Sequence, residues 1–164
     1  MKKEETSSYN ELVEKTGLTE METAKWKEVQ EKIYLPRKEG TKLLEQFEGY
    51  FELDNVTIEK YDENDWPIRP EALKTKKAKE TQINKQADVV MLLHLMGNEF
   101  DDETIKENYA YYEKRTLHGS SLSPSIYSVM GLKVGDDSKA YRYLRRAAFI
   151  DLLNMQGNTR EGIH

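Results

Sequence analysis

The sequence contains no cysteine, and its only histidines are His94, His118 and His164. The lack of cysteine excludes a disulfide framework, a thiolate nucleophile and a cysteine-ligated zinc site. The three histidines are well separated in the sequence, which makes a histidine-rich metal site improbable as well. We therefore expect no metal ion and no organic cofactor.

Long hydrophobic runs and an excess of positive charge are also missing. No apolar stretch approaches the ~20 residues that a membrane-spanning helix needs, and the Lys/Glu-rich start has no signal-peptide core. We therefore expect a cytoplasmic protein without a membrane partner. The net charge of −5 argues against nucleic acid as a partner. The one basic run, residues 74–79, is short and is typical of a solvated face.

Several segments have the pattern of helices. Thr19 and Glu22 form a capping box, and apolar residues at helical spacing follow until Pro36: Trp26, Val29 and Ile33. Residues 1–18 before this helix are predicted to be flexible or partly helical. Further along, the apolar run 89–96 covers nearly the whole circumference of a helix, which predicts a helix buried on all sides.

The C-terminal half continues in the same way. Asp101 or Asp102 is predicted to cap one helix and Asp136 or Asp137 another. The last helix has an apolar stripe at spacings of three and four: Tyr141, Leu144, Ala148 and Leu152. Residues 40–70 are less regular and rich in aromatic side chains, which predicts either a lid on the core or the wall of a pocket. The chain is thus predicted to be mainly all-α, with sequential helical hairpins over 19–164 and a short irregular or extended segment around 40–70.

The segment from Thr116 to Ser125 places His118, Ser120, Ser121 and Ser123 just before Pro124. A helix N-terminus has unpaired N–H groups and a partial positive charge, so added hydroxyls favour phosphate or a carboxylate there. Ser123 before Pro124 is equally what an ordinary helix start looks like, with serine as N-cap. From the residues alone both interpretations stay open, and the plain cap is the commoner of the two.

A second polar cluster, Lys85-Gln86-Ala87-Asp88, opens the apolar helix. Its side chains are able to hydrogen-bond sugar hydroxyls or an anion, but they could equally solvate the first turn, where the helix dipole favours Asp88. If this helix and the one near Pro124 begin on the same rim, the two clusters could converge on one ligand.

Four motifs in matching order resemble the later part of the catalytic domain of glycoside hydrolase family 65, which includes maltose, trehalose and kojibiose phosphorylases. They are Lys85-Gln86-Ala87-Asp88-Val89, Tyr111-Tyr112-Glu113-Lys114-Arg115-Thr116, His118-Gly119-Ser120-Ser121-Leu122-Ser123 and Glu161-Gly162-Ile163-His164. The run Glu45-Gln46-Phe47-Glu48-Gly49-Tyr50-Phe51 is similar to the family's segment upstream of the lysine-glutamine pair. The resemblance extends from about Thr19 to the C-terminus.

The resemblance implies part of an (α/α)₆ barrel and an inverting phosphorolysis, in which an α-glucosidic disaccharide and phosphate give β-glucose 1-phosphate and a sugar. The residues matching Lys85 and Gln86 contact the transferred sugar in the family. Those matching Ser120, Ser121 and His164 hold the phosphate, and His118, which lies beside the serine pair, is a further candidate for phosphate binding. Inorganic phosphate is then a co-substrate rather than a cofactor.

The family's general-acid glutamate belongs to an upstream Gly-Pro-Asp-Glu-Tyr-His segment that this sequence does not contain. No residue here is therefore assigned as catalytic, and this chain is expected to turn over little by itself. The alternatives are a family 65 hydrolase, in which water replaces phosphate, and a non-catalytic helical interaction module. Barrel helices without neighbours would expose apolar faces, which predicts that the isolated chain self-associates or is repacked.

Overall fold

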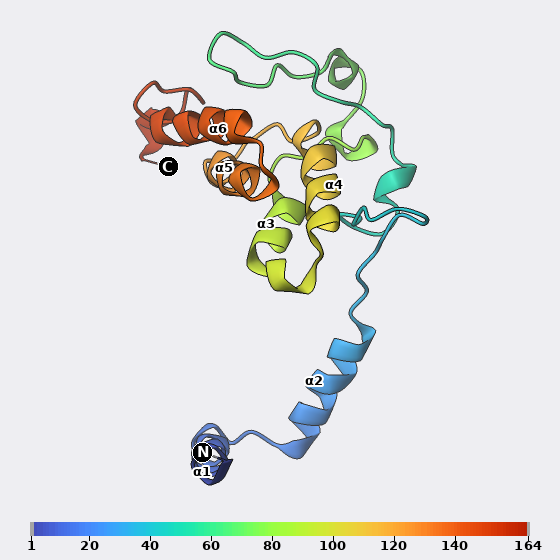
Figure 1. The fold of residues 1–164 in the computed structure, drawn as a ribbon, viewed down its shortest axis with the longest axis vertical. Helices are drawn as coiled ribbons and strands as arrows, with labels where there is room; N and C mark the ends of the chain where they lie inside the picture. Colours follow the sequence, from blue (N-terminus) through green and yellow to red (C-terminus); the bar gives the residue numbers. More distant parts are fainter. Residues whose placement is uncertain (1, 164) are drawn as a thin grey trace. The chain divides into compact units, whose positions relative to one another are not determined.

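The computed structural model describes the backbone of residues 2–163 and the side chains of residues 8–163 (Figure 1). The chain divides into two compact units, residues 1–35 and 36–164. The described residues form helices, 3₁₀ turns and isolated β-bridges, with no extended strand. The all-α prediction is confirmed, as expected for part of an (α/α)₆ barrel. Within the described residues, no helix has the length and apolar character needed to cross a membrane.

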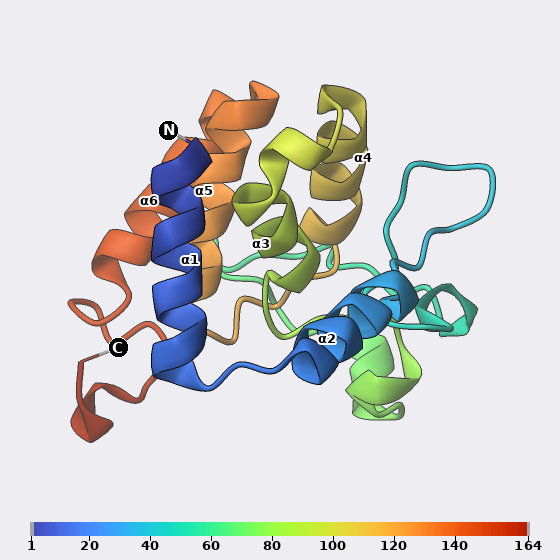
Figure 2. The ribbon, with the colours of Figure 1, turned by 90° about the horizontal axis from the view of Figure 1, so that it is seen from below.

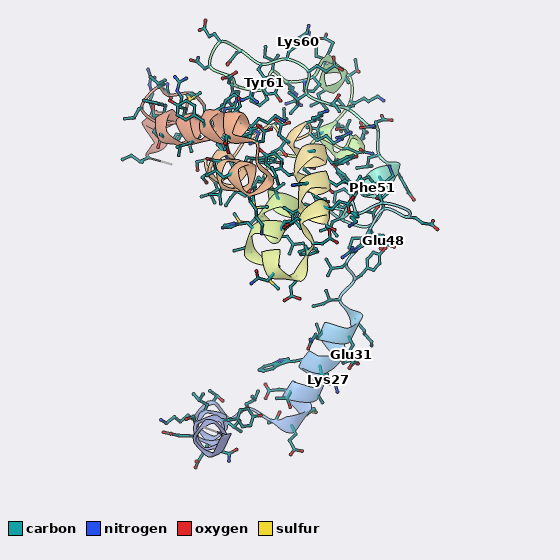
Figure 3. The ribbon with its side chains drawn as sticks, in the orientation of Figure 1. Lys27, Glu31, Glu48, Phe51, Lys60 and Tyr61 are labelled. Carbon is teal, nitrogen blue, oxygen red and sulfur yellow. The ribbon has the colours of Figure 1, made fainter. Side chains whose placement is uncertain are left out.

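The first unit contains α1 (Lys2–Thr16) and α2 (Glu20–Lys32). The predicted capping box starts α2: Thr19 Oγ1 accepts a 3.2 Å hydrogen bond from the Glu22 amide, and Glu22 Oε2 accepts one of 2.9 Å from the Thr19 amide. The helix ends where the Ile33 amide bonds the Val29 carbonyl, three residues before Pro36. Lys27 and Glu31 mark its course in Figure 3.

The second unit is built on α3 (Asp88–Leu95), α4 (Asp102–Glu113), α5 (Leu122–Val134) and α6 (Asp137–Phe149). Helices α3, α4 and α5 pack against one another, and α5 forms a hairpin with α6 (Figures 1 and 2). Asp101 caps α4 by accepting a 2.7 Å bond from the Thr104 amide, and Asp136 caps α6 through the Lys139 amide at 3.1 Å. Of the two predicted cap candidates at each start, the first is correct.

Tyrosines dominate the core of this unit. Five of the described tyrosines are 2% exposed or less: Tyr50, Tyr109, Tyr112, Tyr127 and Tyr143. Helices α5 and α6 approach closely at Gly131, where an added Cβ would lie 3.1 Å from both the Cα and the Cβ of Ala140. This contact lets the rings of Tyr127 and Tyr143 pack against each other, tilted by 39° and with their centroids 5.4 Å apart.

The prediction that the helix over 89–96 is buried on all sides is wrong. Val90 and Leu93 of α3 are fully buried, but Leu95 is 70% exposed and Met96, just past the helix, is 49% exposed. Among the helices of the second unit, this eight-residue helix packs on α4 and α5, and the side that carries Leu95 is exposed.

The apolar stripe predicted for the last helix lies on its exposed side. The buried face of α6 is made by Ala140, Tyr143 and Arg146, with Ile150 just beyond it. All four predicted residues are exposed: Tyr141, Leu144 and Ala148 in α6, and Leu152 three residues past its end. The close contact at Gly131 turns the Ala140 face toward α5, which leaves this stripe outside the hairpin.

The irregular segment 40–70 contains a 3₁₀ turn at Tyr50–Glu52. Further 3₁₀ turns of the described residues lie at Glu71–Lys74, Ala78–Glu80, Gly97–Glu99 and Thr159–Glu161. The Tyr50 hydroxyl donates a 2.6 Å hydrogen bond to the Gln82 carbonyl, and its ring stacks on Tyr112 of α4 with centroids 5.7 Å apart. Phe51 packs against the same core, whereas Lys60 and Tyr61 lie further along the segment (Figure 3). Of the two predicted interpretations, the lid on the core describes residues 50–53.

Candidate functional site

A short parallel pairing joins the two polar clusters. Asn84 and Thr116 form a parallel bridge, in which the Asn84 amide bonds the Arg115 carbonyl at 2.7 Å and the Leu117 amide bonds the Asn84 carbonyl at 2.8 Å. Next to this bridge, the Gly119 amide donates a 2.9 Å hydrogen bond to the Lys85 carbonyl. The start of α3 and the segment before α5 are therefore side by side.

Gly119 gives Lys85 the space it needs at this junction. A Cβ on Gly119 would lie 3.1 Å from Cγ of Lys85 and 3.5 Å from its Cε. The side chain of Lys85 thus passes directly over the residue that precedes Ser120. Lys85 and Gln86 are exposed, and neither side chain has a hydrogen bond or ion pair within the described residues. Asp88 is engaged by Gln46, whose Nε2 donates to Asp88 Oδ2 at 2.8 Å.

Ser120 and Ser121 lie half-buried at the N-terminus of α5. Ser120 Oγ accepts a long 3.4 Å bond from the Leu122 amide, and the Ser121 hydroxyl has no hydrogen-bond partner among the described residues. Both hydroxyls therefore lie where the unpaired N–H groups of a 13-residue helix begin.

Ser123 is not the N-cap of this helix, so that prediction is wrong. The helix starts at Leu122, and Ser121, already in the right-handed helical region, occupies the cap position without a side-chain bond. Pro124 is tolerated inside the first turn because no intrahelical partner is needed for its missing N–H. Ser123 is buried, and its hydroxyl lies 3.2 Å from Nδ1 of His118.

His118 is 1% exposed and has a left-handed backbone with φ of 53°. Its Nε2 lies 3.2 Å from the hydroxyl of Tyr143, so both ring nitrogens are engaged inside the protein. Burial, followed by the nearby charges of Arg146 and Arg142, lowers the pKa of His118 well below 6.5. The imidazole is therefore neutral near pH 7, and in this conformation neither nitrogen is free to contact a ligand.

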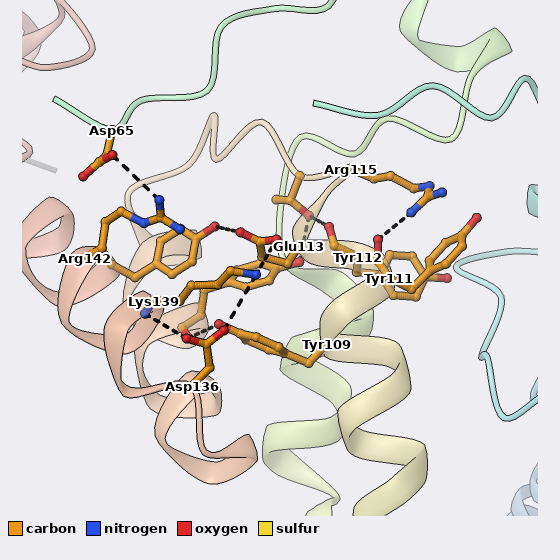
Figure 4. Close-up of polar contacts among 12 residues, drawn as sticks. Asp65, Tyr109, Tyr111, Tyr112, Glu113, Arg115, Asp136, Lys139 and Arg142 are labelled. Atoms are coloured by element: carbon orange, nitrogen blue, oxygen red, sulfur yellow. Dashed lines mark hydrogen bonds and ion pairs between the residues drawn. The ribbon is translucent and has the colours of Figure 1, made fainter. Parts of the chain in front are cut away.

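Tyr143 and Glu113 continue the series of hydrogen bonds that begins at Ser123 and His118, and no sequence motif indicates this role for Tyr143. The Tyr143 hydroxyl donates to Glu113 Oε1 at 3.0 Å, and Lys139 Nζ lies 3.1 Å from Glu113 Oε2. Lys139 also lies 3.7 Å from Asp136 (Figure 4). Glu113, at the end of α4, is thus a buried structural carboxylate and makes no contact with the Ser120–Ser121 segment.

A pocket of about 550 Å³ lies beside α6 and includes Arg142 and Arg146 in its lining. Arg142 forms an ion pair with Asp65 at 3.7 Å (Figure 4). The buried guanidinium of Arg146 lies 5.0 Å from the ring of Trp66 and 5.2 Å from that of Tyr143, with no hydrogen-bond partner within residues 8–163. These cations lower the pKa of His118 further and favour its neutral form.

His164 lies outside the described residues, so its predicted role in holding phosphate stays a prediction. The 3₁₀ turn Thr159–Glu161 leads to Gly162, whose φ of 131° favours glycine. Lys85, Gln86, Ser120 and Ser121 are the predicted site residues that the structure brings to one rim. An ammonium group, an amide and two hydroxyls near a helix N-terminus are suited to a ligand with an oxyanion and several hydroxyls.

The fold is that of an all-α protein built from helical hairpins. Its candidate site is a polar rim at the N-termini of two helices, with side chains suited to a polar ligand. The family profile described as "Glycosyl hydrolase family 65 central catalytic domain" matches residues 1–164, and the chain belongs to this family. The resemblance predicted from the five sequence motifs is thereby confirmed.

The chain is 53% identical over 164 residues to a kojibiose phosphorylase of Thermoanaerobacter brockii, which covers 100% of the chain and 21% of the relative. It is 32% identical over 164 residues to an α,α-trehalose phosphorylase of the same organism, with the same coverage of 100% and 21%. A solved structure of a putative kojibiose phosphorylase from the human microbiome has a TM-score of 0.74 at 35% identity, covering 94% of this chain and 20% of that one. The chain thus spans about a fifth of the length of these relatives.

Proposed function

We propose that this chain supplies the sugar-contacting and phosphate-contacting half of an inverting disaccharide phosphorylase site. Ser120 and Ser121 hold inorganic phosphate with the N-terminus of α5 and with His164. Lys85 and Gln86 contact the sugar that is transferred. The 2.9 Å bond between the Gly119 amide and the Lys85 carbonyl carries this proposal, because it places the two motifs against each other.

The chemistry explains why such a rim suits phosphorolysis. An inverting hydrolase needs a base to activate water, whereas phosphate is already an anionic nucleophile. A phosphate oxygen attacks the anomeric carbon, the glycosidic C–O bond breaks, and the leaving oxygen takes a proton from a general acid. Neutral hydroxyls and backbone N–H groups orient the phosphate and leave one oxygen free to attack. The general acid is not assigned to any residue of this chain.

The hydroxyl pair also favours a phosphorylase over a hydrolase of the same family. A hydrolase has no need of a phosphate-binding site. The hydroxyls of Ser120 and Ser121 also contribute little to the fold. The Ser120 hydroxyl makes a single long hydrogen bond, and the Ser121 hydroxyl makes none within the described residues. Glu113 is not a replacement acid, because Tyr143 and Lys139 already engage its two oxygens.

Kojibiose is the disaccharide that the comparisons favour. Two phosphorylases of one organism match this chain over the same 164 residues, and the kojibiose enzyme is 53% identical where the trehalose enzyme is 32% identical.

The proposal is tested by titrating the chain with inorganic phosphate and following its backbone amides by NMR. We expect saturable shifts at Gly119, Ser120 and Ser121 that disappear in the Ser120→Ala/Ser121→Ala double variant. Ser125→Ala is the matched control, because the Ser125 hydroxyl only bonds the Leu122 carbonyl inside α5. If phosphate does not bind, or binds equally to the double variant, the phosphate site is refuted and the non-catalytic helical module is the better description.

A further inference from the structure

His118 and Ser123 form a side-chain staple around the two serines. His118 precedes Ser120–Ser121 and Ser123 follows them, and the 3.2 Å contact between Nδ1 and Oγ closes the segment. The backbone is held at the same two points. The Ser123 amide bonds the Ser120 carbonyl at 3.2 Å, and Gln156 Nε2 bonds the His118 carbonyl at 3.3 Å.

The direction of every hydrogen bond in this staple follows from counting protons. Tyr143 has one hydroxyl proton, which it donates to the carboxylate of Glu113. Toward His118 its oxygen can therefore only accept, so Nε2 of His118 donates. A neutral imidazole has a single N–H, which leaves Nδ1 as the acceptor for the Ser123 hydroxyl.

Aromatic rings and charged groups around these hydrogen bonds hold the side chains of His118, Tyr143 and Glu113 in place. The His118 ring meets Tyr127 edge-on and tilts against Tyr143, with both centroid distances at 4.9 Å. Burial raises the pKa of the Tyr143 hydroxyl well above 10, so it keeps its proton. The carboxylate of Glu113 is fixed by Lys139, which reaches it from α6.

We propose that Glu113 and Tyr143 are positioning residues for the phosphate segment: they fix His118 as its Nε2–H tautomer, and His118 in turn fixes Ser123 and the curvature of Ser120–Ser121. The left-handed backbone of His118, unusual for a residue with a side chain, is held by this arrangement. The proposal rests on the proposed function of the two serines, but its first test does not involve phosphate.

The first test reads the His118 tautomer from the ¹⁵N shifts of its ring nitrogens in the unmodified chain. We expect the Nε2–H form at pH 7, and a dominant Nδ1–H form would overturn the proposal. In Glu113→Gln the side-chain amide has one oxygen, and Lys139 keeps its bond to that oxygen. The amide N–H group then faces Tyr143 and donates to its hydroxyl. The Tyr143 hydroxyl in turn donates to Nε2 of His118, which reverses the direction of that bond. The Nδ1–H tautomer should then become populated, and an unchanged tautomer would contradict the assigned direction.

The second test measures phosphate affinity. Tyr143→Phe should weaken phosphate binding by about tenfold, the effect of losing one hydrogen bond of the chain. Tyr141→Phe is the matched control, because Tyr141 is 65% exposed on the same helix. Ser123→Ala removes the hydrogen bond between Ser123 and His118 and should weaken phosphate binding by a similar factor. This variant provides the test if Tyr143→Phe does not fold.

The two failures are distinguishable. If Ser120→Ala/Ser121→Ala abolishes phosphate binding while Tyr143→Phe and Ser123→Ala bind normally, the serines hold phosphate and the positioning role is refuted. If the double variant has no effect, the proposed function fails whatever the tautomer of His118.

Discussion

The carbonyl oxygen of Lys85 accepts a 2.9 Å hydrogen bond from the amide of Gly119, and the Lys85 side chain passes over the same glycine. This contact lies next to the isolated parallel bridge between Asn84 and Thr116, which joins the segments that precede α3 and α5. It converts two polar motifs, 34 residues apart at Lys85 and Gly119, into one rim.

Gly119→Ala should disturb the rim without unfolding the protein. The added methyl group would lie 3.1 Å from Cγ of Lys85, which is closer than an ordinary contact, so the lysine side chain has to move. Because that side chain is exposed, we expect the free energy of unfolding to change by about 0.5 kcal/mol or less. Glucose titration followed by NMR should show weaker binding at Lys85 and Gln86. Unchanged glucose affinity would mean that the position of Lys85 is unimportant.

Gly131→Ala should destabilise the α5–α6 hairpin. The new Cβ would lie 3.1 Å from the Cα of Ala140 and from the hydroxyl of Tyr109, and a backbone atom cannot yield as a flexible side chain does. Overpacking of this kind costs about 1–3 kcal/mol. Urea denaturation measures the loss, with Val129→Ala on the exposed side of α5 as the control. Equal midpoints for the two variants would contradict the close packing.

The stability of the second unit should fall as the pH drops below 7, because of His118. Its pKa is lowered on folding, so between that value and 6.5 the unfolded chain binds more protons and is favoured by acid. The expected slope is at most about 1.4 kcal/mol per pH unit. His118→Gln should flatten it, while the exposed His94→Gln should not. The measurement is urea denaturation at several values between pH 5 and 8, and a flat wild-type profile would contradict a buried neutral imidazole.

Asp101 should stabilise α4 more strongly when its carboxyl group is ionised than when it is neutral. The Thr104 amide, followed by Lys42, lowers the pKa of this carboxyl from 3.8 to about 2. The stabilisation is therefore complete above pH 4 and is lost as the pH falls from 4 toward 2. Asp101→Asn keeps an N-cap acceptor and should remove this pH dependence, whereas Asp101→Ala should lower stability at neutral pH as well. Thermal denaturation across that range separates the two variants.

Local rules were sufficient for the starts of α2, α4 and α6, though not for that of α5. Thr19 with Glu22, Asp101 and Asp136 cap helices as their side chains predict, since a cap depends on residues within one turn. The pairing of Lys85 with Gly119 was anticipated only as a possible convergence, because a parallel bridge depends on distant segments.

Burial was predicted less well than helix starts. Hydrophobic periodicity marked Tyr141 and Leu144, but the face of α6 that is buried was decided by the small residues Gly131 and Ala140, which no period reveals. Ser123 before Pro124 has the local pattern of a cap, whereas its contact with His118 depends on the left-handed backbone of His118, which that pattern does not reveal. The chain from His118 through Tyr143 to Glu113 joins α4 to α6 and leaves no local pattern.

The central claim is that the Lys85–Gln86 and Ser120–Ser121 motifs bind one ligand. Titration with β-glucose 1-phosphate tests it most directly, because this molecule has both a sugar and a phosphate. The account predicts that the amides of Lys85, Gln86, Gly119, Ser120 and Ser121 shift together with a single Kd, and that Ser120→Ala/Ser121→Ala weakens the response at both motifs. Shifts at only one motif, or two different Kd values, would contradict it.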